Sequence, residues 1–162
     1  MGKEQKIVEA IERMSHNQVI SKSLLFSDAI TQEKLSKHSK YVQLEQGEKP
    51  LFMVDVRVFL WGLTTGLLVT DRNVYYQCMK IKKLFRGLTM PLSSKKRGKV
   101  ALNDLNEISL GDFVIGSGTD TSYLGHRLLI NGTVIGTLVL GKGLTFDSNL
   151  VENLQQLFKA MS

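Results

Sequence analysis

The chain has 162 residues, of which 43% are hydrophobic and 22% charged, and its formal net charge is +6. This length and composition predict one soluble globular domain and argue against a disordered, collagen-like or membrane-embedded chain. The single cysteine, Cys78, rules out an intramolecular disulfide and a cysteine-based zinc site, and no apolar run approaches the roughly 18 residues that a transmembrane helix needs.

Residues 1–46 are predicted to form an N-terminal helical extension. Asn17 can cap a second short helix that includes Leu24, and Ser27 or Thr31 can cap a third. The first helix is indicated by apolar residues at helical spacing, namely Ile7, Val8, Ile11 and Met14.

The polar run 43–50 separates this extension from a β-rich body. After it, apolar residues at every second position from Phe52 to Leu60 predict a long first strand. Two β-favouring runs then flank the polar turn 70–73 and predict a hairpin. On its second arm the side chains are expected to alternate between two faces, with Val74, Tyr76 and Cys78 on one and Tyr75, Gln77 and Met79 on the other.

Later turns extend the β pattern. Residues 100–102 and 105–110 are predicted to be short strands on either side of a bend, and Asn131-Gly132 predicts a type I′ hairpin because both residues tolerate positive φ. Apolar residues at helical spacing predict a closing helix over 147–160. We expect about seven strands between residues 51 and 140, and one core that contains Phe52, Val54, Val56, Leu68, Val74, Tyr76, Leu128, Ile130, Leu138, Leu154 and Phe158.

These expectations place the chain in the α+β class, mainly β. Residues 66–76, residues 100–108 and the final hairpin before the closing helix resemble, in this order, the pleckstrin-homology-like (PH-like) domains, including GRAM-type and bacterial PH-like modules. The resemblance covers residues 47–162. It implies a seven-stranded antiparallel barrel or sandwich capped by the C-terminal helix, used for binding and not for catalysis.

The chain departs from the lipid-binding members of that family in one respect. Their phosphoinositide-binding Lys and Arg residues lie on the first hairpin, whereas the loop 62–66 of this chain has no basic residue. An inositide specificity is therefore not carried over.

Positive charge is concentrated in the segment 80–99, which has eight basic residues and no acidic one, so the other residues carry a net −2, the difference between +6 and +8. Gly87 and Pro91 favour a loop in the middle of this segment. Two interpretations stay open. The segment either binds an anion, such as phosphate or an anionic lipid headgroup, or it is a solvated loop. The candidate anion-binding residues are Lys80, Lys82, Lys83, Arg86, Lys95, Lys96, Arg97 and Lys99.

The predicted function is a non-catalytic binding module. Its expected partner is a protein or an anionic membrane surface, and nucleic acid is the alternative. Nucleic acid is less favoured because Phe85 is the only aromatic residue in the basic segment on which a base could stack. No cofactor, metal site or catalytic residue is expected, since the three histidines share no ligand spacing and Cys78 falls on a core face. The apolar stripe of the first helix must be buried in the chain or against a second copy, which favours a homo-oligomer. We expect a cytoplasmic location, peripheral to the membrane if lipid is bound.

Overall fold

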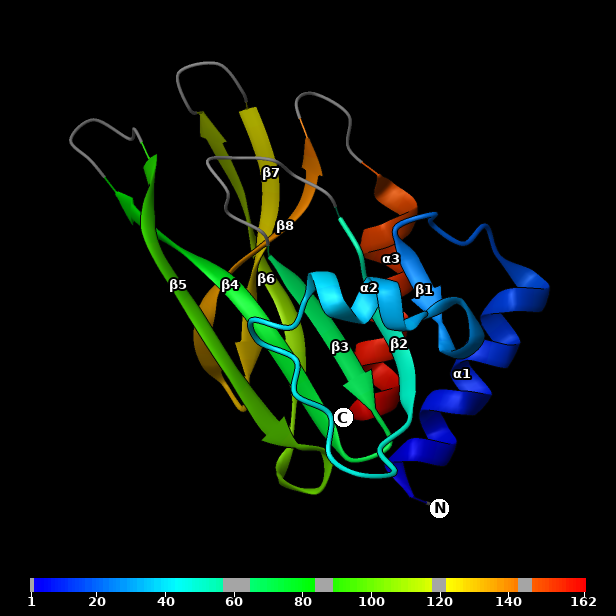
Figure 1. Cartoon of the computed structure of the whole chain (residues 1–162). Helices are drawn as coiled ribbons and strands as arrows, with labels where there is room; N and C mark the ends of the chain where they lie inside the picture. The colour runs from blue at the N-terminus through cyan, green and yellow to red at the C-terminus, as the bar shows by residue number, and fades with distance from the viewer. Residues whose placement is uncertain (1, 57–64, 84–88, 118–121, 143–146) are drawn as a thin grey trace.

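The computed structural model describes residues 2–56, 65–83, 89–117, 122–142 and 147–162. Within these ranges, eight antiparallel strands form one curled sheet in the order β1-β2-β3-β4-β8-β7-β6, and β5 pairs with β4 off this path (Figure 1). The α+β, mainly β class is confirmed. The strands are β1 (Leu24–Phe26), β2 (Pro50–Val54), β3 (Gly66–Thr70), β4 (Asn73–Lys83), β5 (Thr89–Ala101), β6 (Ile108–Ser117), β7 (Ser122–Ile130) and β8 (Thr133–Lys142). The α-helices are α1 (Lys3–Asn17), α2 (Gln32–Lys37) and α3 (Ser148–Met161), and short 3-10 helices span Ser27–Ala29 and Leu102–Asp104.

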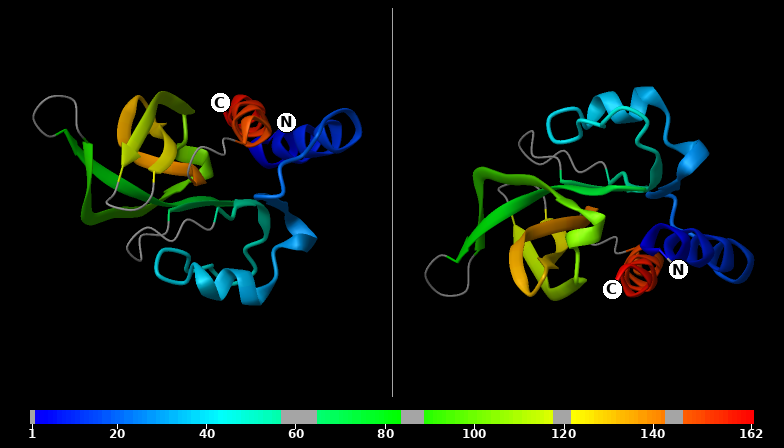
Figure 2. Two further views of the ribbon diagram at one scale, coloured as in Figure 1. Left: turned by 90° about the horizontal axis from the view of Figure 1, so that it is seen from above. Right: turned by 90° about the horizontal axis from the view of Figure 1, so that it is seen from below.

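The inner face of the curled sheet encloses the main core. Helices α3 and α1 lie side by side on this face, as both views of Figure 2 show. The stripe of α1 is buried there through Ile7, Ala10 and Met14. Burial of this stripe therefore needs no second copy of the chain, and the homo-oligomer stays a prediction.

The opposite face of the sheet carries a second, smaller core under the residues between β1 and β2 (Figure 2). Its buried members are Ile30, Leu35, Tyr41, Val42, Met53, Leu68 and Tyr75. The prediction that Leu68 shares the main core is wrong, because strand alternation turns Leu67 and Val69 inward and Leu68 outward. Val56 is only partly buried, against the main core.

Two predicted hairpins and the closing helix are confirmed. In the first hairpin, β3 and β4 pair with Val69 opposite Val74. In the last, Asn131 and Gly132 have φ values of 51° and 73°, as a type I′ turn requires. The closing helix is α3, and its N-cap Asp147 accepts a hydrogen bond from the backbone N–H of Leu150 at 3.2 Å.

Two predictions on local structure are wrong. The second short helix is replaced by β1, whose Leu24 pairs with Val54 of β2, because a short apolar run takes the structure that its neighbours offer. The first strand, predicted over residues 52–60, is β2 and ends at Val54; residues 57–64 lie outside the described part of the chain.

The loop predicted for the middle of the basic segment is wrong at Pro91, which belongs to β5, whereas Gly87 lies outside the described residues. Strand β4 extends to Lys83, and β5 begins at Thr89, so most of the segment forms a two-stranded ribbon (Figure 1). Among the described strands β5 pairs with β4 alone, and a proline such as Pro91 is tolerated on an edge strand because its missing N–H breaks no ladder on the open side.

We expect Leu154→Ala to lower the free energy of unfolding by about 2 to 5 kcal/mol, because Leu154 is fully buried where α3 meets the main core. Urea denaturation measures the change, with Gln155→Ala, an exposed neighbour on α3, as the control. Equal stability of the two variants would contradict this packing.

Candidate functional site

The register of the β4–β5 ribbon decides which basic residues share a face. Lys95 lies opposite Met79, Arg97 opposite Gln77 and Lys99 opposite Tyr75. Since paired residues of antiparallel strands point to the same side, these three cations lie on the face of the sheet that carries the second core. The described part of the ribbon therefore gathers three of the predicted site residues on one face.

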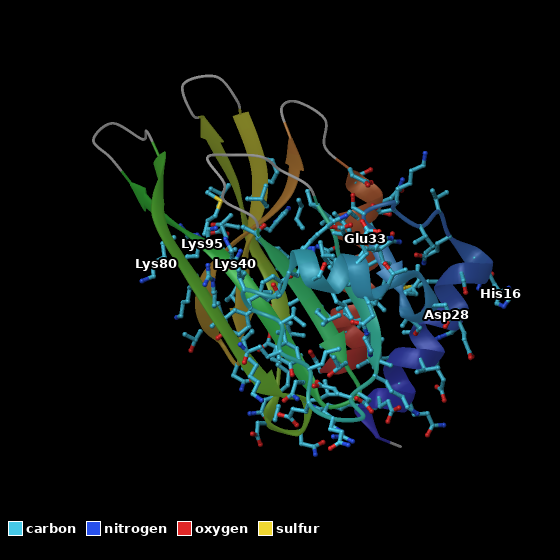
Figure 3. All side chains as sticks on the ribbon, viewed as in Figure 1. His16, Asp28, Glu33, Lys40, Lys80 and Lys95 are labelled. Carbon is cyan, nitrogen blue, oxygen red and sulfur yellow. The ribbon has the colours of Figure 1, made fainter. Side chains whose placement is uncertain are left out.

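Arg97 and Lys99 line a cleft of about 270 Å³ between β5 and the chain that follows α2. Lys95 does not line it, but lies close enough to Arg97 and Lys40 for their charges to act on it. Lys40 is exposed and lies near Lys95 in Figure 3, although 55 residues separate them in the sequence. Sequence reasoning missed Lys40, since no local pattern relates it to the basic segment. The residues around the cleft are Lys40, Tyr41, Gln43, Tyr75, Arg97, Gly98 and Lys99.

The cleft is strongly positive. Burial, followed by the charges of Arg97 and Lys40, lowers the pKa of Lys95. Lys99 forms an ion pair with Glu45 at 2.6 Å, and this contact raises the pKa of Lys99. Within the described ranges, no carboxylate forms an ion pair with Lys40 or Arg97. Lys40, Lys95 and Arg97 thus lie close together, an arrangement that attracts anions.

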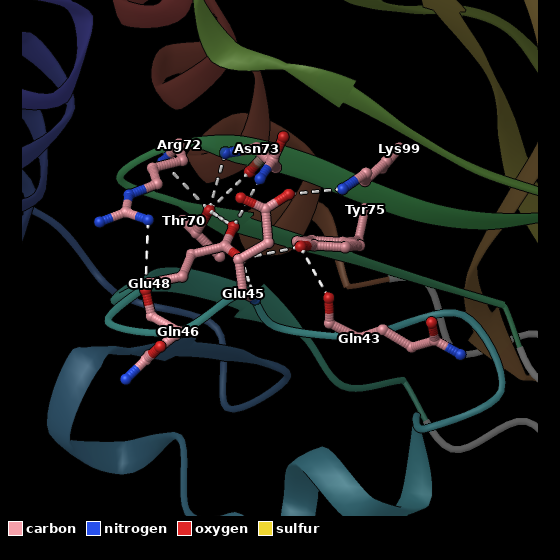
Figure 4. A network of polar contacts seen from close by, with 9 residues as sticks. All are labelled: Gln43, Glu45, Gln46, Glu48, Thr70, Arg72, Asn73, Tyr75 and Lys99. Atoms are coloured by element: carbon pink, nitrogen blue, oxygen red, sulfur yellow. Dashed lines mark hydrogen bonds and ion pairs between the residues drawn. The ribbon is translucent and has the colours of Figure 1, made fainter.

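A buried carboxylate holds one wall of the cleft in place (Figure 4). Glu48 accepts hydrogen bonds from the Thr70 hydroxyl, from the Asn73 side-chain amide at 3.0 Å and from the Tyr75 hydroxyl at 2.8 Å. It also accepts from the backbone N–H of Glu45 at 2.8 Å. Burial alone would raise the pKa of Glu48, but these hydrogen bonds together lower it. The carboxylate therefore fixes residues 45–48 to the β3–β4 hairpin.

A second buried polar contact anchors Tyr41 at the edge of the cleft. Its hydroxyl lies 3.0 Å from Nδ1 of His38, whose Nε2 lies 3.3 Å from Oδ1 of Asp55. The Tyr41 hydroxyl lies where a Cβ on Gly66 would be, so only glycine at this position lets the ring cross β3. Burial and the charge of Asp55 raise the pKa of Tyr41, so the hydroxyl stays protonated at neutral pH.

Two other predicted site residues, Lys80 and Lys96, do not join the cleft. Lys96 lies opposite Cys78, on the other face of β5, and alternation places the exposed Lys80 on the face opposite to Met79. Lys82 and Lys83 belong to β4, but their side chains are outside the described set, and Arg86 lies outside the described residues altogether.

Cys78 and His126, whose side chains are of types that can act in catalysis, are both held in packing contacts. Cys78 is fully buried in the main core, and burial raises its pKa to about 12, so it is a neutral thiol at neutral pH. His126 packs edge-on against Phe113 across β6 and β7, and its Nδ1 lies 2.9 Å from the carbonyl oxygen of Gly111. In the part of the chain that the structure describes, no three His, Cys, Asp or Glu side chains are grouped as metal ligands.

We expect Glu48→Gln to weaken the dependence of stability on acid pH. The folded carboxyl has a lowered pKa, so the folded state binds fewer protons than the unfolded state. The free energy of unfolding therefore falls as the pH drops from the ordinary glutamate pKa of about 4.3 through the lower folded value. Urea denaturation across this window should give a shallower slope for Glu48→Gln, together with a loss of about 1 to 3 kcal/mol at neutral pH.

Glu152→Gln removes an exposed carboxylate from α3 and is the control. If Glu48→Gln and Glu152→Gln show the same acid slope, the hydrogen bonds to Glu48 do not stabilise its charged form.

No helix in the described ranges has both the length and the apolar character needed to cross a membrane. Comparisons of the chain with protein-family models, with curated proteins and with solved structures found no significant match. The geometry of the cationic cleft is therefore the evidence on which a functional assignment rests.

Proposed function

We propose that this protein is a non-catalytic binding module that takes a phosphate-bearing anion in the cationic cleft beside β5. The observation that carries the proposal is the convergence of Lys40, Lys95 and Arg97, which come from two distant segments, on one face of the sheet. Placing like charges together is unfavourable, and an anion bound among them removes the repulsion. An acidic membrane surface or a free phosphate compound would each supply such an anion.

A PH-like relationship is part of the same proposal. Its support is the order of elements, with seven strands from Pro50 to Lys142 that curl around one core and are followed directly by α3. A binding role fits this arrangement, because the cleft lies on the outer face of the sheet and leaves the core intact.

A phosphate ligand is favoured over the bases of a nucleic acid. The two aromatic residues at the cleft, Tyr41 and Tyr75, are 8% and 2% exposed, so neither offers an open ring face on which a base could stack. The phosphates of a nucleic acid and an acidic protein partner remain outcomes that the test distinguishes.

We expect replacement of Lys40, Lys95 and Arg97 together by Ala to weaken binding to acidic vesicles about 100-fold, because each cation near an acidic surface contributes about 1 kcal/mol. Co-sedimentation with vesicles containing phosphatidylserine measures this, and the binding of the unaltered protein should fall as salt rises.

The matched control replaces Arg13, Lys22 and Lys159 by Ala. These are also one arginine and two lysines, and all are exposed and away from the cleft. Equal loss in both triple variants would mean that net charge alone drives binding. Binding to duplex DNA but not to vesicles would favour the nucleic-acid alternative, and salt-insensitive capture of a protein would favour a protein partner.

A further inference from the structure

One cation of the cleft is held in position by a buried side chain. Gln77 of β4 is 1% exposed, and Arg97 lies directly opposite it on β5 with an exposed side chain. The Nε–H of Arg97 donates to Oε1 of Gln77 at 2.6 Å. Because the acceptor is buried, this contact orients the guanidinium at its base.

The contact determines which atoms of Arg97 remain available. A guanidinium has five N–H groups in a fixed plane, and Gln77 takes the one on Nε. Within the described part of the chain the two Nη groups have no hydrogen-bond partner, and they form a fork that matches two oxygens of one oxyanion. Because the side chain is already oriented, binding loses little further rotamer entropy.

The neighbouring cations add charge but no comparable geometry. Lys40 and Lys95 end in ammonium groups, which act as point charges on flexible stems. Lys99 is engaged by Glu45 at 2.6 Å. Among the described cations at or near the cleft, Arg97 alone combines a planar donor fork with a buried support.

We propose that Arg97 is the specificity-determining residue of the cleft, and that Gln77 is a positioning residue which presents the Nη fork to two oxygens of a single phosphate group. The inference rests on the proposed anion-binding function. It adds that the cleft is a localised oxyanion site rather than a diffuse charged surface.

Arg97→Lys tests this directly, because it keeps the charge and removes the fork. We expect binding of inorganic phosphate, followed by NMR titration, to weaken about tenfold or more. The decrease of affinity with rising salt should keep its slope, since the number of charges is unchanged. Arg13→Lys is the matched control, an exposed arginine on α1 away from the cleft, and should bind phosphate like the unaltered protein.

Gln77→Met tests the positioning role. It keeps the side-chain length and removes the acceptor, and we expect phosphate binding to weaken about two- to tenfold. The Nε–H resonance of Arg97 should move and exchange faster with water, a change that a purely structural role for Gln77 would not produce. If Gln77→Met does not fold, the result for Arg97→Lys decides, because Arg97 is exposed.

Titration with phosphatidylserine vesicles beside inorganic phosphate separates a lipid headgroup from a free anion. If Arg97→Lys and Gln77→Met both bind inorganic phosphate or the vesicles more weakly than the unaltered protein does, the inference is supported. If Arg97→Lys binds both probes like the unaltered protein while the triple Ala variant does not, the anion-binding function stands and the localised site is wrong. If the unaltered protein binds neither probe, both proposals are wrong.

Discussion

The buried carboxylate of Glu48 is the interaction on which the candidate site depends. It lies two residues before β2 and accepts hydrogen bonds from the β3–β4 hairpin and from the backbone of residue 45. The hairpin could form without it, since strand pairing and the Thr70 turn are local. The path of residues 40–47 could not, because these residues are not in a strand and need partners for their polar groups. Glu48 holds residues 45–48 against the sheet, and the contacts of Tyr75 with Gln43 and of Tyr41 with His38 hold the chain next to Lys40.

Strand β4 is the structural link between the core and the cleft. Its inward side chains, such as Tyr76 and Cys78, complete the main core, and its outward side chains, Tyr75 and Gln77, support the other face. Because β5 pairs in register with β4, Lys95, Arg97 and Lys99 lie on the same face of the sheet as Tyr75 and Gln77. A slip of one residue would exchange the two faces and remove the site.

The electrostatics of the cleft follow from its position on the surface. Because Lys40 and Arg97 are exposed, water screens part of the repulsion among the cations, and a bound anion would remove the remainder. The ion pair between Lys99 and Glu45 is about half exposed, at 50% and 48%, and is worth little for the same reason. In contrast, Arg97 is connected to the interior through Gln77, so its orientation is set by a buried contact. The cleft therefore combines a positive charge that attracts anions over a distance with one oriented donor group, the guanidinium of Arg97.

The sequence by itself determined the features that depend on local chemistry. The Asn131-Gly132 turn, the two faces of β4 and the capped closing helix all follow from residue type and spacing over a few positions, and all are confirmed. The concentration of charge in residues 80–99 was equally plain. Tertiary structure alone decided that Leu24 belongs to a strand, that Leu68 lies in a second core and that Lys40 meets Arg97. Each of these depends on which distant residue is the neighbour, and a single sequence carries no local signal of that.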